Sequence, residues 1–99
     1  MSENFVPWDS ARFIKSDEEA RAYLDACMEE DPGDGALIRH ALGVIARARG
    51  MSGLAETTGL SREGLYKALG PDGNPSFATV MKVASALGLR FSVRPEHAA

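Results

Sequence analysis

Apolar residues in the first part of the chain recur at spacings of three and four, the period of a helix with one buried face. Ser16 followed by Glu19 has the spacing of a capping box and predicts a helix start. The expected apolar face of this helix comprises Ala20, Tyr23, Leu24, Cys27 and Met28. The run from Asp31 to Asp34, which contains a proline and a glycine, predicts its end.

A second helix is predicted to begin at Asp34 and to end at Gly50, which we expect to act as an αL cap. Arg47 and Arg49 lie near its C-terminus, where the helix dipole favours positive charge. Its apolar positions are Leu37, Ile38, Ala41, Leu42 and Ile45. The pattern thus predicts two amphipathic helices in succession.

Two shorter helices follow, the first capped by Ser52 and reaching Thr58, the second capped by Ser61 and reaching Leu69. Because only Gly59 and Leu60 separate them, the two helices cannot be collinear. After the turn formed by residues 71–75, Ser76 is expected to cap a fifth helix that Gly88 stops. The expected buried face of this fifth helix comprises Phe77, Val80, Met81, Ala84 and Leu87.

The C-terminal tail alternates apolar and polar residues from Leu89 to Arg94, the period of a half-buried strand. A single strand needs a partner, which can be the stretch around Phe5 and Val6 or the same segment of a second subunit. The predicted fold is therefore all-α, with five helices and a short C-terminal β-strand. We expect one domain over residues 1–99: an acidic N-terminal arm and helix (1–33), a helical core (34–88), and a strand and tail (89–99).

Chain length and apolar content narrow the class of protein further. Ninety-nine residues, 44% of them hydrophobic, suffice for one modest core. No apolar run approaches the roughly 18 residues that cross a bilayer, and the N-terminus lacks the pattern of a signal peptide. We therefore expect a cytoplasmic protein that does not bind membranes.

Charge is distributed unevenly along the chain. Residues 1–35 carry ten acids and three bases, a net charge of -7, whereas residues 36–99 carry eight bases and four acids, a net charge of +4. This asymmetry is typical of a basic surface that meets phosphate. The acidic segment either meets a basic partner or is simply solvated.

Residues able to support catalysis or metal binding are few. Cys27 is the single cysteine and lies at an apolar helical position, so we expect a buried packing thiol. His40 and His97 are the only histidines; they form no metal-ligand spacing with Cys27, and His40 is expected on a helix surface. No nucleophile and base pair can be assembled. We therefore expect neither an enzyme, nor a cofactor, nor a metal site.

The residues between Met51 and Leu69 have the types that a helix-turn-helix requires. Ala55 is small where the two helices approach each other, and Gly59 supplies the positive φ of the turn. The residues expected to point inward are Leu54, Leu60, Leu65 and Leu69. The alternative is an ordinary corner of a helical bundle, in which these residues serve packing alone.

The outer face of the second short helix would then carry Ser61, Arg62, Glu63, Tyr66 and Lys67. Ser61 can bind a phosphate, Arg62 can fork onto guanine, and Lys67 can reach a phosphate or a base edge. Glu63 can accept a hydrogen bond from cytosine, and Tyr66 can contact a thymine methyl group. The pattern therefore predicts a helix that enters the major groove of DNA.

The chain resembles the prophage-type, HigA-like addiction-module antidote proteins. The resemblance rests on the stretches Ile45–Ser52, Gly59–Leu69, Gly73–Val80 and Ala86–Leu89, within a similarity from Leu37 to Val93. Ser52, Asn74 and Ser76 lie in these stretches and complete the candidate DNA-contacting set.

The resemblance implies a lambda-repressor-like helix-turn-helix and a dimeric antitoxin that represses its own operon at an inverted repeat. It also implies a partner, a small basic toxin of the RelE/HigB-like ribonuclease type. Two alternatives remain open at this stage: a stand-alone prophage-type transcriptional regulator without a toxin, and a protein-interaction module that does not bind DNA.

Overall fold

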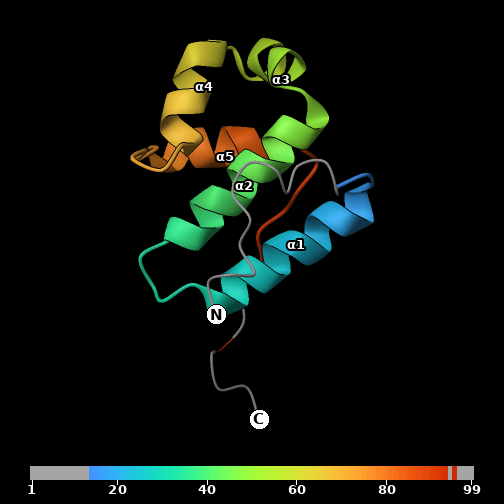
Figure 1. The fold of residues 1–99 in the computed structure, drawn as a ribbon, viewed down its shortest axis with the longest axis vertical. Helices are drawn as coiled ribbons and strands as arrows, with labels where there is room; N and C mark the ends of the chain where they lie inside the picture. Colours follow the sequence, from blue (N-terminus) through green and yellow to red (C-terminus); the bar gives the residue numbers. More distant parts are fainter. Residues whose placement is uncertain (1–13, 94, 96–99) are drawn as a thin grey trace.

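The computed structural model describes residues 14–93 and 95. All the regular secondary structure in this part of the chain is α-helix (Figure 1). Its helices are α1 (Asp17–Glu30), α2 (Ala36–Arg49), α3 (Met51–Thr58), α4 (Arg62–Leu69) and α5 (Phe77–Ala86). In Figure 1, α1 and α2 lie side by side in the lower part of the molecule, and α3 and α4 stand above α5. The expected all-α architecture with five helices is confirmed for these residues.

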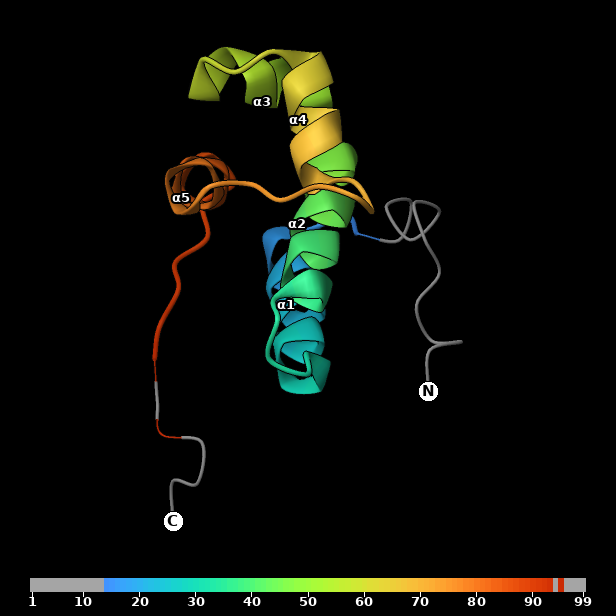
Figure 2. The same cartoon turned by 90° about the vertical axis from the view of Figure 1, so that its left-hand side faces the viewer.

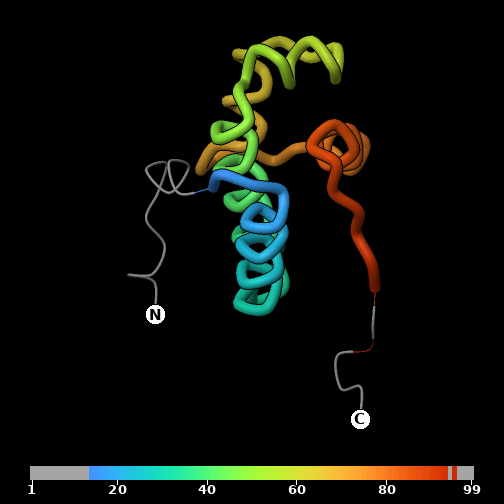
Figure 3. Tube along the Cα trace, turned by 90° about the vertical axis from the view of Figure 1, so that its right-hand side faces the viewer, coloured from blue at the N-terminus to red at the C-terminus, as the bar shows by residue number. Residues whose placement is uncertain are grey.

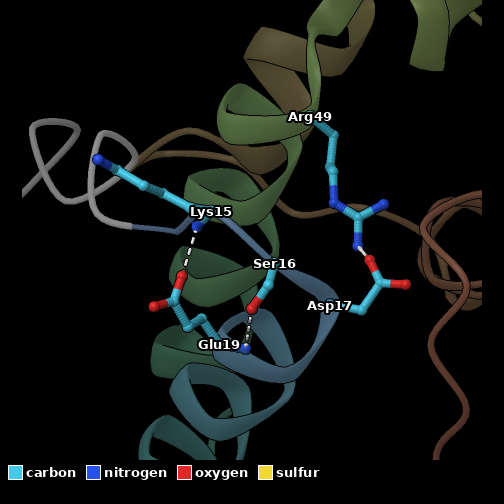
Figure 4. Close-up of polar contacts among 5 residues, drawn as sticks. All are labelled: Lys15, Ser16, Asp17, Glu19 and Arg49. Carbon is cyan, nitrogen blue, oxygen red and sulfur yellow. Dashed lines mark hydrogen bonds and ion pairs between the residues drawn. The ribbon is translucent and has the colours of Figure 1, made fainter.

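The start of α1 is fixed by side chains that act on the backbone (Figure 4). The Ser16 hydroxyl accepts a hydrogen bond from the Glu19 amide at 3.1 Å, as the sequence predicts. The Glu19 carboxylate accepts from the amide of Lys15 at 2.7 Å rather than from that of Ser16. Arg49 at the end of α2 forms an ion pair with Asp17, which ties the two helices together.

The start of α2 differs from the prediction. The helix begins at Ala36, and its N-cap is Gly35, with φ 82°, rather than Asp34. Asp31 organises the connection instead, because its carboxylate accepts backbone hydrogen bonds from Gly33, Gly35 and Leu37, each 2.9 Å long. The Asp31 carboxylate thus bonds to amides two, four and six residues later in the chain, and helix periodicity does not reveal such contacts.

The middle of α2 forms the centre of the core. Residues 41–46 of α2 are all buried, and α1, α3 and α4 pack around this helix. The larger members of the core are Leu24, Leu42, Ile45, Leu54, Leu65, Leu69, Val83 and Leu87. Cys27 is fully buried among them, which confirms its packing role.

Gly50 separates α2 from α3, and the N-cap of α3 lies two residues earlier than the predicted cap, Ser52. Gly50 has φ 105° and ψ 115°, so its φ is positive, but the αL cap expected there is not formed. The same glycine is the N-cap of α3, and no side chain caps this helix. Ser52 therefore lies inside the first turn of α3 with an exposed side chain, and its expected capping role is wrong.

Helix α5 is capped as expected but only partly buried. Ser76 accepts from the Thr79 amide at 3.1 Å, and Gly88, with φ 75°, follows the C-terminus. The Leu89 amide donates to the Ala84 carbonyl at 2.8 Å, which completes a Schellman motif. At the other end of the helix, Phe77 is 79% exposed and Met81 41% exposed, so the prediction that both face the core is wrong.

The strand predicted for the C-terminal tail is not seen from Leu89 to Val93, and Arg94 lies outside the described residues. Leu89 and Phe91 are half-buried against the helical core, while Arg90 is exposed and Val93 is 97% exposed. The alternation thus reflects a tail lying on the core, because contacts with helices satisfy its apolar side. The suggested partner around Phe5 and Val6 lies outside the described residues.

None of the helices formed by the described residues is long and apolar enough to span a bilayer.

Candidate nucleic-acid interface

Helices α3 and α4 are joined by a short, tightly bonded turn. Gly59 lies in the αL region, with φ 78° and ψ 9°, and its amide donates to the Ala55 carbonyl at 2.9 Å. The Thr58 hydroxyl donates to the Leu54 carbonyl at 2.8 Å and accepts from the Leu60 amide at 3.2 Å. The positive φ expected at Gly59 is confirmed, and the turn holds the two helices at a fixed angle.

The start of α4 is capped locally by Ser61. Its hydroxyl accepts from the Gly64 amide at 2.9 Å. A Cβ atom at position 64 would lie 3.0 Å from that hydroxyl, so glycine leaves the space in which the cap forms. The predicted cap is confirmed, and it sets the direction of the first turn of α4.

The two faces of α4 divide as the sequence predicts. Leu65 and Leu69 are fully buried, Leu54 is buried on α3, and Leu60 in the turn is half-buried. The outward residues, all exposed, are Ser61, Arg62, Glu63, Tyr66 and Lys67. The Arg62 guanidinium carbon lies 6.0 Å from the centre of the Tyr66 ring, within the range of a cation–π contact.

A shallow hollow of 290 Å³ joins this face to the start of α3. It is lined by Arg47, Gly50, Met51, Ser52, Gly53, Arg62 and Tyr66. Arg47 and Arg62 line this hollow together with the first turn of α3, which has no side-chain cap. From the sequence, Arg47 is expected only near the C-terminus of α2. It lines the hollow with Ser52 and Arg62 because α2 contacts both α3 and α4.

The loop between α4 and α5 is held against α2. Arg39 donates to the carbonyls of Gly73 at 3.2 Å and of Pro71 at 3.1 Å. A Cβ atom at Gly73 would lie 2.1 Å from the Ala68 carbonyl oxygen, so only glycine allows this approach. Asn74 and Ser76 follow with exposed side chains, Ser76 as the cap of α5.

The ionisable groups near α1 and α2 respond to burial and to hydrogen bonds. Burial lowers the pKa of His40 from 6.5, and the nearby charge of Arg39 lowers it further. His40 is half-buried, so it does not lie on the open helix surface expected for it. Burial raises the pKa of the Cys27 thiol, which keeps it protonated and unsuited to nucleophilic chemistry.

The acidic residues gather on α1, away from the pair of short helices. Helix α1 contains six acids and one base, Arg21. In Figure 2, α1 occupies the lower part of the molecule and α3 and α4 the top. Within residues 14–93 and 95, no group of three histidine, cysteine or acidic side chains is placed to hold a metal ion.

The chain is similar to known proteins over almost its whole length. A family model described as "Probable addiction module antidote protein" matches residues 4–95. A curated protein of Haemophilus influenzae is 52% identical over 94 residues, which is 95% of this chain and 95% of that protein. No solved structure matches the chain. The family match includes the acidic N-terminal third, where the resemblance seen in the sequence is less distinctive.

Proposed function

The chain belongs to the probable addiction module antidote protein family, and on that premise we propose that it is an antitoxin that also represses its own operon. Repression requires a DNA-binding surface, and the helix-turn-helix formed by α3 and α4 is our candidate. The observation that carries the proposal is the division of α4 into a leucine face buried in the core and an exposed polar face.

In this proposal α4 is the recognition helix and enters the major groove. Arg62 forks onto a guanine, and its position over Tyr66 limits the conformations that it loses on binding. Glu63 accepts from a cytosine amino group, and Tyr66 packs on a thymine methyl. Lys67, one turn after Glu63, reaches a phosphate or a base edge.

Phosphates are proposed to bind on both sides of α4. One phosphate occupies the hollow beside Arg47, Arg62 and Ser52, where it caps the free amides at the start of α3. On the other side of α4, Asn74 and Ser76 contact the DNA backbone. Both residues follow the loop segment that Arg39 holds in place. These contacts fix the register of α4 without reading sequence.

We propose that two copies bind together at an inverted repeat. Phe77 and Met81 form an exposed apolar strip on α5, one turn apart, and Lys82 is the single charged residue of that helix. Pairing these strips about a two-fold axis would cover both. The two recognition helices would then fit half-sites separated by about 34 Å, one turn of DNA, or a multiple of it.

The antitoxin role assigns the second partner, a small basic ribonuclease of the RelE/HigB-like type encoded beside this gene. The family suggests a regulatory protein rather than an enzyme, and the acids of α1 offer a surface for a basic protein. A stand-alone prophage-type regulator would bind the same DNA but would have no toxin, and a pure interaction module would bind no DNA.

A mobility-shift titration with the DNA upstream of the gene tests the DNA-binding part. We expect a specific shift whose affinity falls steeply with salt, because bound Lys and Arg side chains release counterions from the phosphates. Equal affinity for upstream and scrambled DNA would refute sequence-specific binding. An affinity that does not change with salt would refute the phosphate contacts.

A further inference from the structure

A groove of 770 Å³ lies between α1 and the C-terminal tail. Figures 2 and 3 show the tail running down from α5 along the side of the α1–α2 layer, while α3 and α4 lie above α5. One wall is the side of α1 that carries residues 17, 18, 21, 24, 25, 28 and 29, a single helical face. The other wall is the tail from Leu87 to Val93.

The groove is lined by apolar side chains and by charged side chains with an excess of acids. Its apolar residues are Leu24, Met28, Leu87, Leu89, Phe91 and Val93, and the last of these is 97% exposed. Its charged residues are four acids, Asp17, Glu18, Asp25 and Glu29, and two bases, Arg21 and Arg90. Asp17 is paired with Arg49, whereas Glu18 and Asp25 are exposed at the rim.

The tail wall also offers backbone. Residues 90–93 belong to no helix or strand among the described residues. Their amide and carbonyl groups can therefore bond to an incoming extended segment, as at the edge of a sheet. The groove thus combines apolar contacts, negative charge and open backbone along one line.

We propose that this groove binds a basic, amphipathic segment of the toxin. The inference rests on the proposed antitoxin function and specifies the surface that this function uses. Apolar side chains of the segment would fill the interior, and its Lys or Arg side chains would meet Glu18 and Asp25. A second copy of this chain that docks through its own α1 is disfavoured, because two acidic helices would bring like charges together at the rim.

Point substitutions test the groove better than deletion of α1, which supplies Ala20, Leu24 and Cys27 to the core. The double variant Glu18→Lys/Asp25→Lys reverses the exposed rim. The matched control is Glu30→Lys, an exposed acid on the same helix that does not line the groove. The probe is the purified product of the small reading frame beside this gene, titrated calorimetrically into each full-length variant, with the affinity of each variant for upstream DNA measured in parallel.

We expect the double variant to bind the probe at least about tenfold more weakly than the wild type, because attraction at the rim becomes repulsion. The control should bind the probe within about twofold of the wild type, and neither variant should lose affinity for DNA. Slower hydrogen exchange of residues 90–93 in the complex would support backbone pairing with the tail.

Three results would overturn the inference. If the probe binds the wild type and the double variant equally, the toxin docks elsewhere while the antitoxin role stands. If Glu30→Lys weakens binding as much as the double variant, general negative charge rather than the groove is responsible. If the probe does not bind even the wild type, the antitoxin proposal itself fails, and the groove inference fails with it.

Discussion

Replacing Asp31 with alanine should remove the contacts that order the connection between α1 and α2. Its carboxylate accepts three backbone hydrogen bonds of 2.9 Å, of which those from Gly35 and Leu37 are partly buried and that from Gly33 is exposed. Loss of a capping side chain costs about 1 kcal/mol. In the variant the exposed Gly33 amide can bond to water instead, so its loss costs little. The two partly buried amides, of Gly35 and Leu37, lose their partner, and we expect the free energy of unfolding to fall by about 2 kcal/mol.

Urea unfolding followed by circular dichroism measures this loss directly, and in a chain of this length about 2 kcal/mol also lowers the Tm by roughly 8 to 16 °C. The matched control is Asp34→Ala, which removes one exposed hydrogen bond of 3.0 Å from the Ala36 amide. We expect the control to cost about 0.5 kcal/mol. Equal losses from the two substitutions would refute the assignment of the cap to Asp31.

The same carboxylate predicts a pH dependence. Burial alone would raise the pKa of Asp31, but the amides of Gly35, Gly33, Leu37 and Ile38 outweigh it and hold the pKa below its ordinary value of 3.8. Because the folded-state pKa is the lower one, this stabilisation is fully present above pH 3.8 and is lost as the pH falls toward the folded value. Asp31→Ala should therefore unfold with a weaker pH dependence below pH 3.8 than the wild type.

Three further predictions concern DNA, assembly and His40. Arg62→Ala should cost about 1 to 3 kcal/mol of binding free energy for the operator and little for scrambled DNA. Lys67→Ala should weaken binding to both DNAs and reduce the salt slope by about 1. In mobility shifts, an equal loss of Arg62→Ala on both DNAs would contradict base reading. Phe77→Ser/Met81→Ser should sediment as a monomer, and a persisting dimer would move the interface off α5. Because burial and then Arg39 lower the folded-state pKa of His40, its stabilisation is complete above pH 6.5 and falls as the pH drops toward the folded value. In urea titrations, His40→Gln should remove the part of the stability loss below pH 6.5 that is due to His40. A variant with the same pH profile as the wild type would argue against this role of His40.

Local signals in the sequence predicted the parts of the fold that depend on neighbouring residues. Ser16, Ser61 and Ser76 cap helices as expected, and Gly59 adopts the expected positive φ. Each of these features depends on hydrogen bonds or sterics within three or four residues. The leucine face of α4 was also predictable, because helical period alone decides which of its residues share a side.

The features that were missed depend on distant residues or on surfaces with no partner in the chain. Ser52 does not cap α3, because Gly50 redirects the chain before the serine is reached. Arg47 joins the hollow beside Arg62 only because α2 and α4 meet in space. Periodicity places Phe77 on the apolar face of α5, but it cannot show whether the side chain packs within its own chain or remains exposed.

The separation of charge between α1 and the α3–α4 end gives the molecule an electric dipole. Helix α1 carries six acids and one base, whereas α3 and α4, at the opposite end of the molecule, together carry two acids and two bases (Figure 2). In the proposed complex with DNA, such a dipole turns the less negative end of the molecule, formed by α3 and α4, toward the phosphates before contact is made. The encounter complex would therefore form with α4 facing the duplex, and the acidic helix would point into solvent, open to another protein while the DNA is held.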